Sequence, residues 1–271
     1  MLRCKIAGVA LLALLSVHGQ AQELFVYNEP ASNMPARSAG IRITNWIMGE
    51  TGTNNINYHL LPEIMVGVNH NLMLHAEAFI SNRTQSLKAE GGGLYAKYRI
   101  YTHDKMYHHF RMAVFARGSM NNSDIHQEEI QTNAHNTGYQ LGLISTQLLH
   151  KTALSLTAYY EHDYNNYGGN ELPANLADKA LNFNFSSGHL FYPVHYKGYK
   201  QTNINVMVEA MSQLLPQNGK RFIDIAPSVQ FIFNSQTRID IGYRQELYST
   251  MQRTAPNGLL VRVEHLLFNI F

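Results

Sequence analysis

Many charged side chains of this 271-residue chain stand at every second position of short segments whose other positions are apolar. Acidic and basic groups gathered on one face in this way could pair with one another. They could also line a water-filled passage in which rings of charge select small solutes. We predict that the following residues line such a passage: Arg42, Glu63, His75, Glu77, Lys97, Arg99, Arg111, Arg117, Glu161, Glu209, Asp224, Arg238, Asp240, Arg244, Glu246, Arg262 and Glu264.

The two signs of charge are distributed unevenly along the chain. Basic residues gather between Lys97 and Arg117, whereas acidic residues precede them at Glu63 and Glu77 and follow them from Glu161 onward. Roughly equal numbers of the two signs would also allow pairing across strands. Bulky residues share the same phase, namely Phe79, Phe115, Met207 and Phe222. A narrow or packed interior is therefore an alternative to an open pore, and a wide porin is disfavoured.

Histidine suggests a second chemistry. His75 shares its phase with Glu63 and Glu77, and three further histidines lie in the turn 102–109. Imidazole combined with carboxylates can bind zinc or copper. However, no pair of histidines is spaced to present two ligands on one strand face. We therefore predict neither a metal site nor a cofactor.

A lipid-acting hydrolase is the rival interpretation. Such an enzyme needs a serine and a histidine close together on the lipid side, with the base oriented by a third polar group. Ser187 and His189 share a phase two residues apart, but the sequence shows no evident third group and no G-x-S-x-G pattern. We predict no catalytic residue and no enzyme activity.

The elements that position these side chains are strands, because the alternation has a period of two. It is plainest between Tyr58 and Asn82, where two alternating segments fold back on each other at His70-Asn71. In one segment, 138–149, Ser145 and Gln147 fall in the apolar phase, which suggests a β-bulge.

The spacing of such segments predicts about twelve strands, an even number, beginning near Ser38 and ending with a strand from Leu259 to Phe271. Short turns alternate with longer loops, of which the longest are expected at 121–136 and 165–178. Bacterial outer-membrane barrels show this asymmetry, and their strands have roughly ten residues.

Alternation alone does not say which face is inside, since a soluble barrel also alternates with its apolar side inward. The positions of the charged residues decide the question, because the apolar positions of the strands carry almost no charged side chains. An Arg or Lys on a lipid-facing position costs about 2 to 4 kcal/mol at the bilayer midplane. A sheet in hydrocarbon must also pair all its backbone groups, so it must close. The sequence therefore predicts an all-β fold, a closed antiparallel up-and-down transmembrane β-barrel.

The first residues are typical of a secretory signal peptide, 1–21, with Arg3 and Lys5 before an apolar run too short to span a bilayer. The only cysteine, Cys4, would leave with it, so we expect no disulfide. Residues 22–37 contain two prolines and show no period. We expect a periplasmic lead-in or a plug segment there, followed by the barrel over 38–271.

The formal net charge of +2 is near neutral, and Lys and Arg are scattered singly. Nucleic acid is therefore not an expected partner. No apolar run after the first residues is long enough for a membrane-spanning helix. The expected partners are membrane lipid and a small polar solute.

A final strand that ends in Phe271 resembles the assembly signal of single-chain bacterial outer-membrane barrels. That resemblance implies an outer-membrane location and recognition of the last strand by the barrel-assembly machinery. The stretch NEPASNMPARS, residues 28–38, resembles a group of uncharacterised Gram-negative outer-membrane barrels. More distantly, the chain is similar to transporter-type barrels of phenol meta-pathway or metal-efflux gene clusters. The resemblance assigns no functional residue.

Together these patterns predict a channel or transport component for small polar solutes. Two alternatives stay open besides it. One is the hydrolase, and the other is a plugged structural or adhesive barrel that acts through its long loops 121–136 and 165–178.

Overall fold

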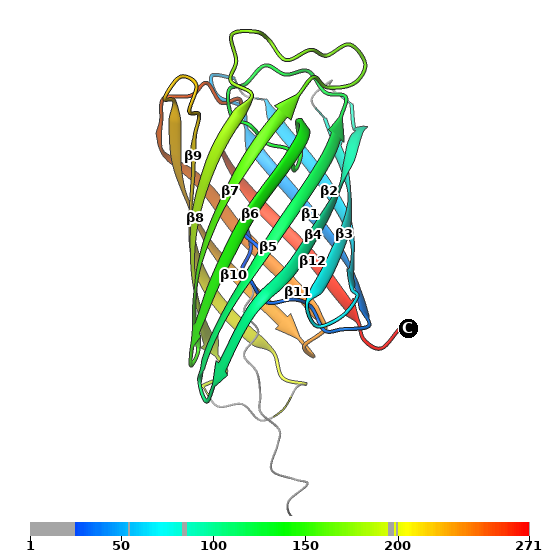
Figure 1. Ribbon diagram of the computed structural model, residues 1–271, viewed down its shortest axis with the longest axis vertical. Helices are drawn as coiled ribbons and strands as arrows, with labels where there is room; N and C mark the ends of the chain where they lie inside the picture. The colour runs from blue at the N-terminus through cyan, green and yellow to red at the C-terminus, as the bar shows by residue number, and fades with distance from the viewer. Residues whose placement is uncertain (1–24, 54, 83–85, 195–197, 199, 271) are drawn as a thin grey trace, which may run out of the picture.

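The chain forms a closed barrel of twelve antiparallel strands in the computed structural model (Figure 1). The structure describes residues 25–53, 55–82, 86–194, 198 and 200–270. The expected signal peptide and Phe271 lie outside the described residues. Each strand pairs with its neighbours in sequence, and β1 closes the barrel by pairing with β12. The predicted fold class and strand number are confirmed.

The strands have the following bounds: β1 Ser38–Gly49, β2 Ile56–Gly67, β3 Leu72–Ser81, β4 Lys88–Lys105, β5 His108–Asn121, β6 Thr137–Leu149, β7 Thr152–Tyr164, β8 Lys179–Tyr192, β9 Asn203–Leu214, β10 Arg221–Phe233, β11 Thr237–Ser249 and β12 Asn257–Leu267. The last strand is shorter than the predicted 259–271, since it ends at Leu267. Across the described ranges, no helix is long and apolar enough to cross a membrane.

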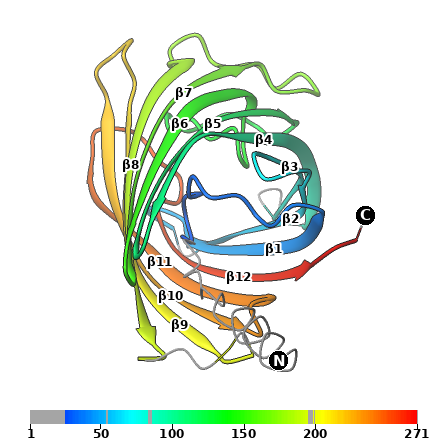
Figure 2. The same cartoon turned by 60° about the horizontal axis from the view of Figure 1, so that its bottom comes forward.

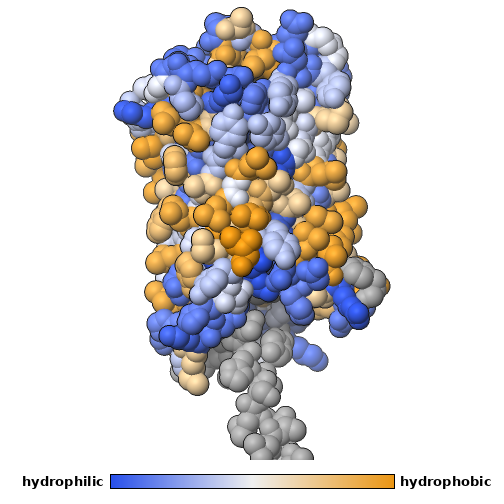
Figure 3. Space-filling view, viewed as in Figure 1, coloured by the Kyte–Doolittle hydropathy of each residue, from blue (hydrophilic) through white to orange (hydrophobic). Residues whose placement is uncertain are grey.

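Side chains alternate between the outside and the lumen along each strand. On β11, Ile241 is 45% exposed on the outer surface, whereas neighbouring Asp240 is 0% exposed inside. The exposed residues include many Ile, Leu, Val and Phe side chains, and they form an apolar belt between two polar ends (Figure 3). Soluble monomers rarely expose continuous apolar surface of this extent. The belt is the exterior expected of a barrel that spans a bilayer.

The connections differ between the two ends of the barrel. One end has tight turns such as 150–151 and 234–236, while the other carries the long loops 122–136 and 165–178. In the turn 234–236, Asn234 and Ser235 both adopt positive φ angles of 51° and 55°. Asn tolerates this conformation better than most residues do, which favours a tight reversal.

The expected β-bulge in 138–149 is wrong. β6 pairs without a register shift with both β5 and β7. Ser145 and Gln147 simply stay on the outer face near the short-turn end, where the Gln147 side-chain amide donates to the backbone oxygens of His109 and Leu148, both at 3.0 Å. Register shifts occur instead near Phe79, Arg99, Leu190 and Ile223.

The lumen is occupied by chain segments. Residues 25–37, drawn in blue, cross the inside of the barrel in the end-on view (Figure 2). Phe25 and Val26 are buried against Leu148, Met207 and Leu260, which project inward from three different strands. The segment therefore packs on the inner wall much as a core element packs in a soluble protein.

We predict that Ile241→Arg destabilises the folded barrel in phospholipid vesicles. The free energy of unfolding, measured by denaturant titration, should fall by about 2 to 4 kcal/mol because the guanidinium would face hydrocarbon. Ile241→Leu is the matched control and should stay close to wild type. An unchanged unfolding midpoint in Ile241→Arg would contradict a lipid-facing β11.

Candidate functional site

Glu209 on β9 holds the start of the inward segment. Its carboxylate accepts the backbone N–H groups of Val26 and Tyr27, each at 2.8 Å, and of Asn28 at 3.0 Å. The hydroxyl of Ser186 donates to the same carboxylate at 2.9 Å. Consecutive backbone N–H groups form an anion-binding concavity of this kind. The dipoles of these groups stabilise the negative charge of Glu209, and the carboxylate in turn satisfies three backbone N–H groups of the segment.

Lys97 on β4 holds the next part of the segment. Its Nζ atom donates to the backbone oxygens of Pro30 and Ser32 at 2.7 and 2.9 Å. It also lies 3.4 Å from the carboxylate of Glu29. The Ala31 N–H donates to the Thr146 hydroxyl at 2.9 Å. Residues 26–32 are therefore anchored by side chains from β4, β6 and β9, on different sides of the barrel.

Glu29 brings a charge of the segment into the lumen. It lies 2.7 Å from Arg42 of β1. Burial alone would raise the pKa of Glu29, but the charges of Arg42 and Lys97 outweigh that effect and hold the pKa well below its usual range. Glu29 therefore stays ionised and ties the segment to β1 as well as to β4.

The loop 122–136, which connects β5 to β6, also folds into the barrel. The Ile130 backbone makes two hydrogen bonds of 2.9 Å with the side chain of Gln213. Thr132 donates to Glu161 from its backbone N–H at 2.8 Å and from its hydroxyl at 2.9 Å. Glu161, like Glu209, is thus a buried lumen carboxylate bound to an inward-folded segment.

Glu129 fixes the same loop through charge. Its two oxygens lie 2.8 Å from Arg244 and 2.6 Å from Arg253. Burial would raise the pKa of Glu129, but the two guanidinium groups outweigh it and lower the pKa to about 2. Asp224 completes the cluster, since both arginines also bind its carboxylate, at 2.6 and 2.7 Å.

On the adjoining strands β11, β12, β1 and β2, a second charge cluster is built around Arg42. Arg42 and Arg238 both bind Glu264, at 2.7 and 2.8 Å. Arg42 also lies 3.4 Å from Glu63. Arg117 lies 2.9 Å from Glu77 in the same region. These pairs cross-link four or more strands inside the barrel, where isolated charges would be costly.

The predicted polar-face residues are all directed away from the apolar belt, and none is fully exposed. Those that are buried are Arg42, His75, Lys97, Glu161, Glu209, Asp224, Arg238, Asp240, Arg244 and Glu264. Those that are partly buried are Glu63, Glu77, Arg99, Arg111, Arg117, Glu246 and Arg262. The structure gathers most of them into the two clusters, while Arg99 and Arg111 lie near the short-turn end. Their role in lining a pore stays a prediction.

Three ionised groups of the site, Glu29, Glu129 and Arg253, were missed by the sequence analysis. All three lie outside the strands, so no alternation marks them. The only available signal was a slight excess of basic over acidic residues between Arg221 and Phe271. Such a signal does not identify a partner.

Glu63, His75 and Glu77 could each offer one ligand atom to a metal ion, and these atoms lie within 4.8 Å of one another. However, Arg42 approaches Glu63 and Arg117 binds Glu77. Both carboxylates therefore already have cationic partners, which disfavours a divalent cation between them. The trio is better explained as part of the charge cluster.

Ser187 and His189, the candidate hydrolase pair, lie on β8 in the outward phase. The Nδ1 atom of His189 lies 2.8 Å from the Thr152 hydroxyl on β7. This contact ties the histidine to the adjacent strand at the short-turn end. No feature of the pair favours catalysis over that structural contact.

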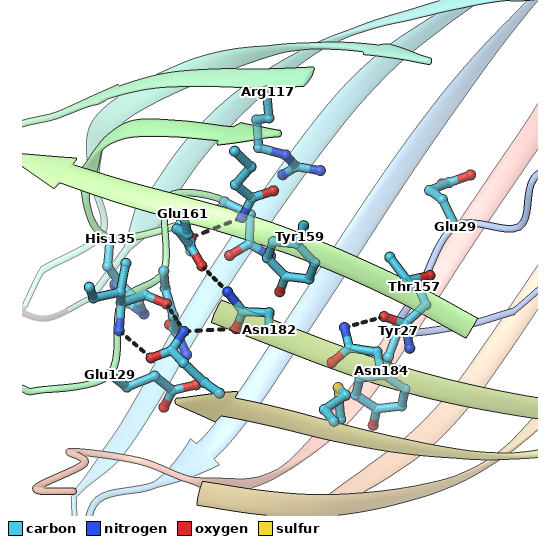
Figure 4. Close-up of a pocket in the computed structure, with 18 of the residues that line it drawn as sticks. Tyr27, Glu29, Arg117, Glu129, His135, Thr157, Tyr159, Glu161, Asn182 and Asn184 are labelled. Carbon is cyan, nitrogen blue, oxygen red and sulfur yellow. Dashed lines mark hydrogen bonds between the residues drawn. The ribbon is translucent and has the colours of Figure 1, made fainter. Parts of the chain in front are cut away.

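A cavity of about 170 Å³ lies between residues 27–29 and the inward loop (Figure 4). We call it the central chamber. Its walls include Trp46, Tyr95, Tyr159, Asn182 and Asn184, contributed by β1, β4, β7 and β8. A second cavity of about 80 Å³ adjoins it beside Arg42, Glu63 and Arg262. The lumen thus contains polar spaces between the two segments that fill it.

No family model matches the chain, and no curated protein matches it. The structure is similar to the COG4313 outer membrane channel from Pseudomonas putida F1, with a TM-score of 0.57 and 8% identity over 90% of this chain and 100% of that one. OccK5 from Pseudomonas aeruginosa has a TM-score of 0.39 at 12% identity, covering 82% of this chain and 62% of its own. The first likeness shows the fold, that of an outer-membrane β-barrel.

Glu129→Gln tests the charge cluster that fixes the loop. Because the folded-state pKa of Glu129 is lowered to about 2, the carboxylate stabilises the fold above its ordinary pKa near 4.5 and loses that effect as the pH falls toward 2. At pH 7 the variant should lose about 1.5 to 3 kcal/mol of unfolding free energy. The difference from wild type should shrink below about pH 4.5.

Glu128→Gln is the matched control in the same loop. Glu128 pairs with Lys220, whose side chain is 40% exposed and therefore partly hydrated, so the loss at pH 7 should be below about 1 kcal/mol. Equal losses in the two variants, or a Glu129→Gln effect that does not change with pH, would contradict the assigned cluster.

Proposed function

We propose that this protein is a channel of the bacterial outer membrane that passes small polar solutes through its lumen. The observation that carries the proposal is the combination of a closed, apolar-faced barrel with an interior of ionised and amide side chains. A membrane barrel needs the former to reside in lipid. A polar interior is what a water-filled passage for solutes requires.

The fold comparison supports the proposal but assigns no functional residue. The similar Pseudomonas putida protein is described as an outer membrane channel, and the whole of that chain is covered. We infer in addition that the barrel is assembled in the outer membrane through recognition of its last strand. Membership of the transporter-type barrels of phenol meta-pathway or metal-efflux clusters stays a prediction.

The inward segment 25–37 would control passage. Polar contacts to Glu209, Lys97, Thr146 and Arg42 anchor it, and such contacts can exchange with water. Its apolar contacts to the wall are made by Phe25, Val26 and Ala31. We infer that the segment leaves its position on the wall, at least in part, when a solute passes. The loop 122–136 would stay in place and form the remaining constriction of the lumen.

A plugged structural barrel is the second candidate, because the same two segments fill the lumen. It differs from the channel in one respect. The segments would then be permanent parts of the interior, and removing an anchor would only destabilise the protein.

Planar-bilayer recordings separate the two candidates. Glu209→Ala removes the acceptor of three backbone N–H groups, so the inward segment should detach more often and the open probability should rise severalfold. Glu171→Ala is the control with the same change of charge. Glu171 is exposed in the loop 165–178, and its variant should conduct like wild type.

Circular dichroism should show the same β structure in wild type and both variants. If neither wild type nor Glu209→Ala carries current, the channel proposal is wrong and the structural barrel is supported. Equal currents in all three proteins would support a channel but remove the role of the segment.

A further inference from the structure

The central chamber is large enough for more than ordered water. A buried water needs roughly 10 to 15 Å³ of space measured in the same way, so about 170 Å³ would hold on the order of ten waters. Residues 27–29 border it from one side and residues 129–135 from the other. A small molecule crossing the lumen would therefore meet the chamber between the two inward segments.

The ionised groups that line the chamber are already neutralised. Arg117 binds Glu77, and Arg244 binds both Glu129 and Asp224. Glu29 binds Arg42. A charged solute would have to break one of these buried pairs to gain a partner, which is unfavourable. The chamber thus disfavours both anions and cations.

Glu161 also lines the chamber, but its partners are neutral groups and not cations. It contacts no cation among the ion pairs of the described residues. Its oxygens accept hydrogen bonds from Thr132, from Gln140 at 2.9 Å and from Asn182 at 3.1 Å. These neutral donors occupy the carboxylate lone pairs through which Glu161 would bind the ammonium group of a cationic solute.

The remaining lining is aromatic and amide in character. Aromatic walls come from Tyr27, Trp46, Tyr95, Phe115 and Tyr159, and carboxamides come from Asn28, Gln140, Asn182, Asn184 and Gln213. Aromatic faces pack well against the C–H face of a saturated ring. A carboxamide both donates and accepts, as does a hydroxyl group.

Some of this hydrogen-bonding capacity is unused. The Tyr95 hydroxyl is buried and, within the described part of the chain, has no hydrogen-bond partner. Asn182 uses one N–H for Glu161 and its oxygen for Gln213, which leaves its second N–H. A buried phenol without a partner is costly, and a ligand hydroxyl would become that partner once the Tyr95 ring shifts toward the chamber, because the oxygen itself has almost no accessible surface.

We propose that the central chamber binds an uncharged, hydroxyl-rich ring compound of monosaccharide size. This inference rests on the proposed channel function, because the solute must reach the chamber through the lumen. Stacking on the aromatic walls and hydrogen bonding to the amides and Tyr95 would select it. The paired charges would exclude its acidic and basic analogues.

The chain itself carries a reporter for binding. Trp46 is its only tryptophan, lines the chamber and lies 5.3 Å from the Tyr27 ring in an edge-on contact. Refolded full-length protein is titrated with glucose, glucuronate and 6-amino-6-deoxyglucose while Trp46 fluorescence is followed. We expect a saturable change with glucose and binding weaker by about tenfold or more for both charged sugars.

Two tyrosines on β4 give a matched pair of variants. Tyr95→Phe removes the hydroxyl and keeps the ring, and it should weaken glucose binding about fivefold. Tyr98→Phe makes the same chemical change on the outer face, where Tyr98 is exposed, and should bind like wild type. Unchanged affinity in Tyr95→Phe would overturn the assigned contact.

The results that would refute the binding site differ from those that would refute the channel. Normal bilayer conductance without a saturable response to glucose overturns the chamber proposal and leaves the channel intact. Equal binding of the charged sugars, or a response to benzyl alcohol alone, overturns the assigned solute class. Glucose binding without any conductance overturns the channel and keeps the site.

Discussion

Closure of the sheet is the constraint on which the rest of the structure depends. In hydrocarbon, every backbone N–H and C=O group needs an internal partner, and pairing of β1 with β12 removes the last two free edges. Closure also separates the side chains into two environments. Apolar residues such as Ile241 face outward, while Asp240, one position earlier, is enclosed. Charge can then be concentrated inside at no cost to membrane insertion.

The enclosed charges are used in two different ways. Arg42 and Arg238 both pair with Glu264 and cross-link β1, β11 and β12. Glu209 and Glu161 instead bind polypeptide, through the backbone N–H groups of the inward segment and of Thr132. Buried carboxylates without cations would be strongly unfavourable unless donors surround them. The two segments and the two acids therefore stabilise each other.

This reciprocity links the architecture to the proposed function. The inward segment and the inward loop leave the central chamber between them, and their own ion pairs neutralise its charged walls. A lumen rich in ionisable residues thus presents a mainly neutral surface of rings, amides and hydroxyls. Counting charges along the strands would give the opposite impression.

The sequence by itself determined the number of strands, their phase and the bounds of the two long loops, because alternation is a local property and lipid excludes charge from one phase. The expected turn 102–109 is wrong, since β4 continues to Lys105 and β5 begins at His108. The predicted loops 121–136 and 165–178 agree within one residue with the observed loops 122–136 and 165–178. Only the tertiary structure decided that residues 25–37 and 122–136 fold inward. Those segments have no period, and their contacts join residues as distant as Val26 and Glu209. Long-range contacts also decided which charged groups pair with Glu29, Glu129 and Arg253. A local sequence pattern does not encode such partners.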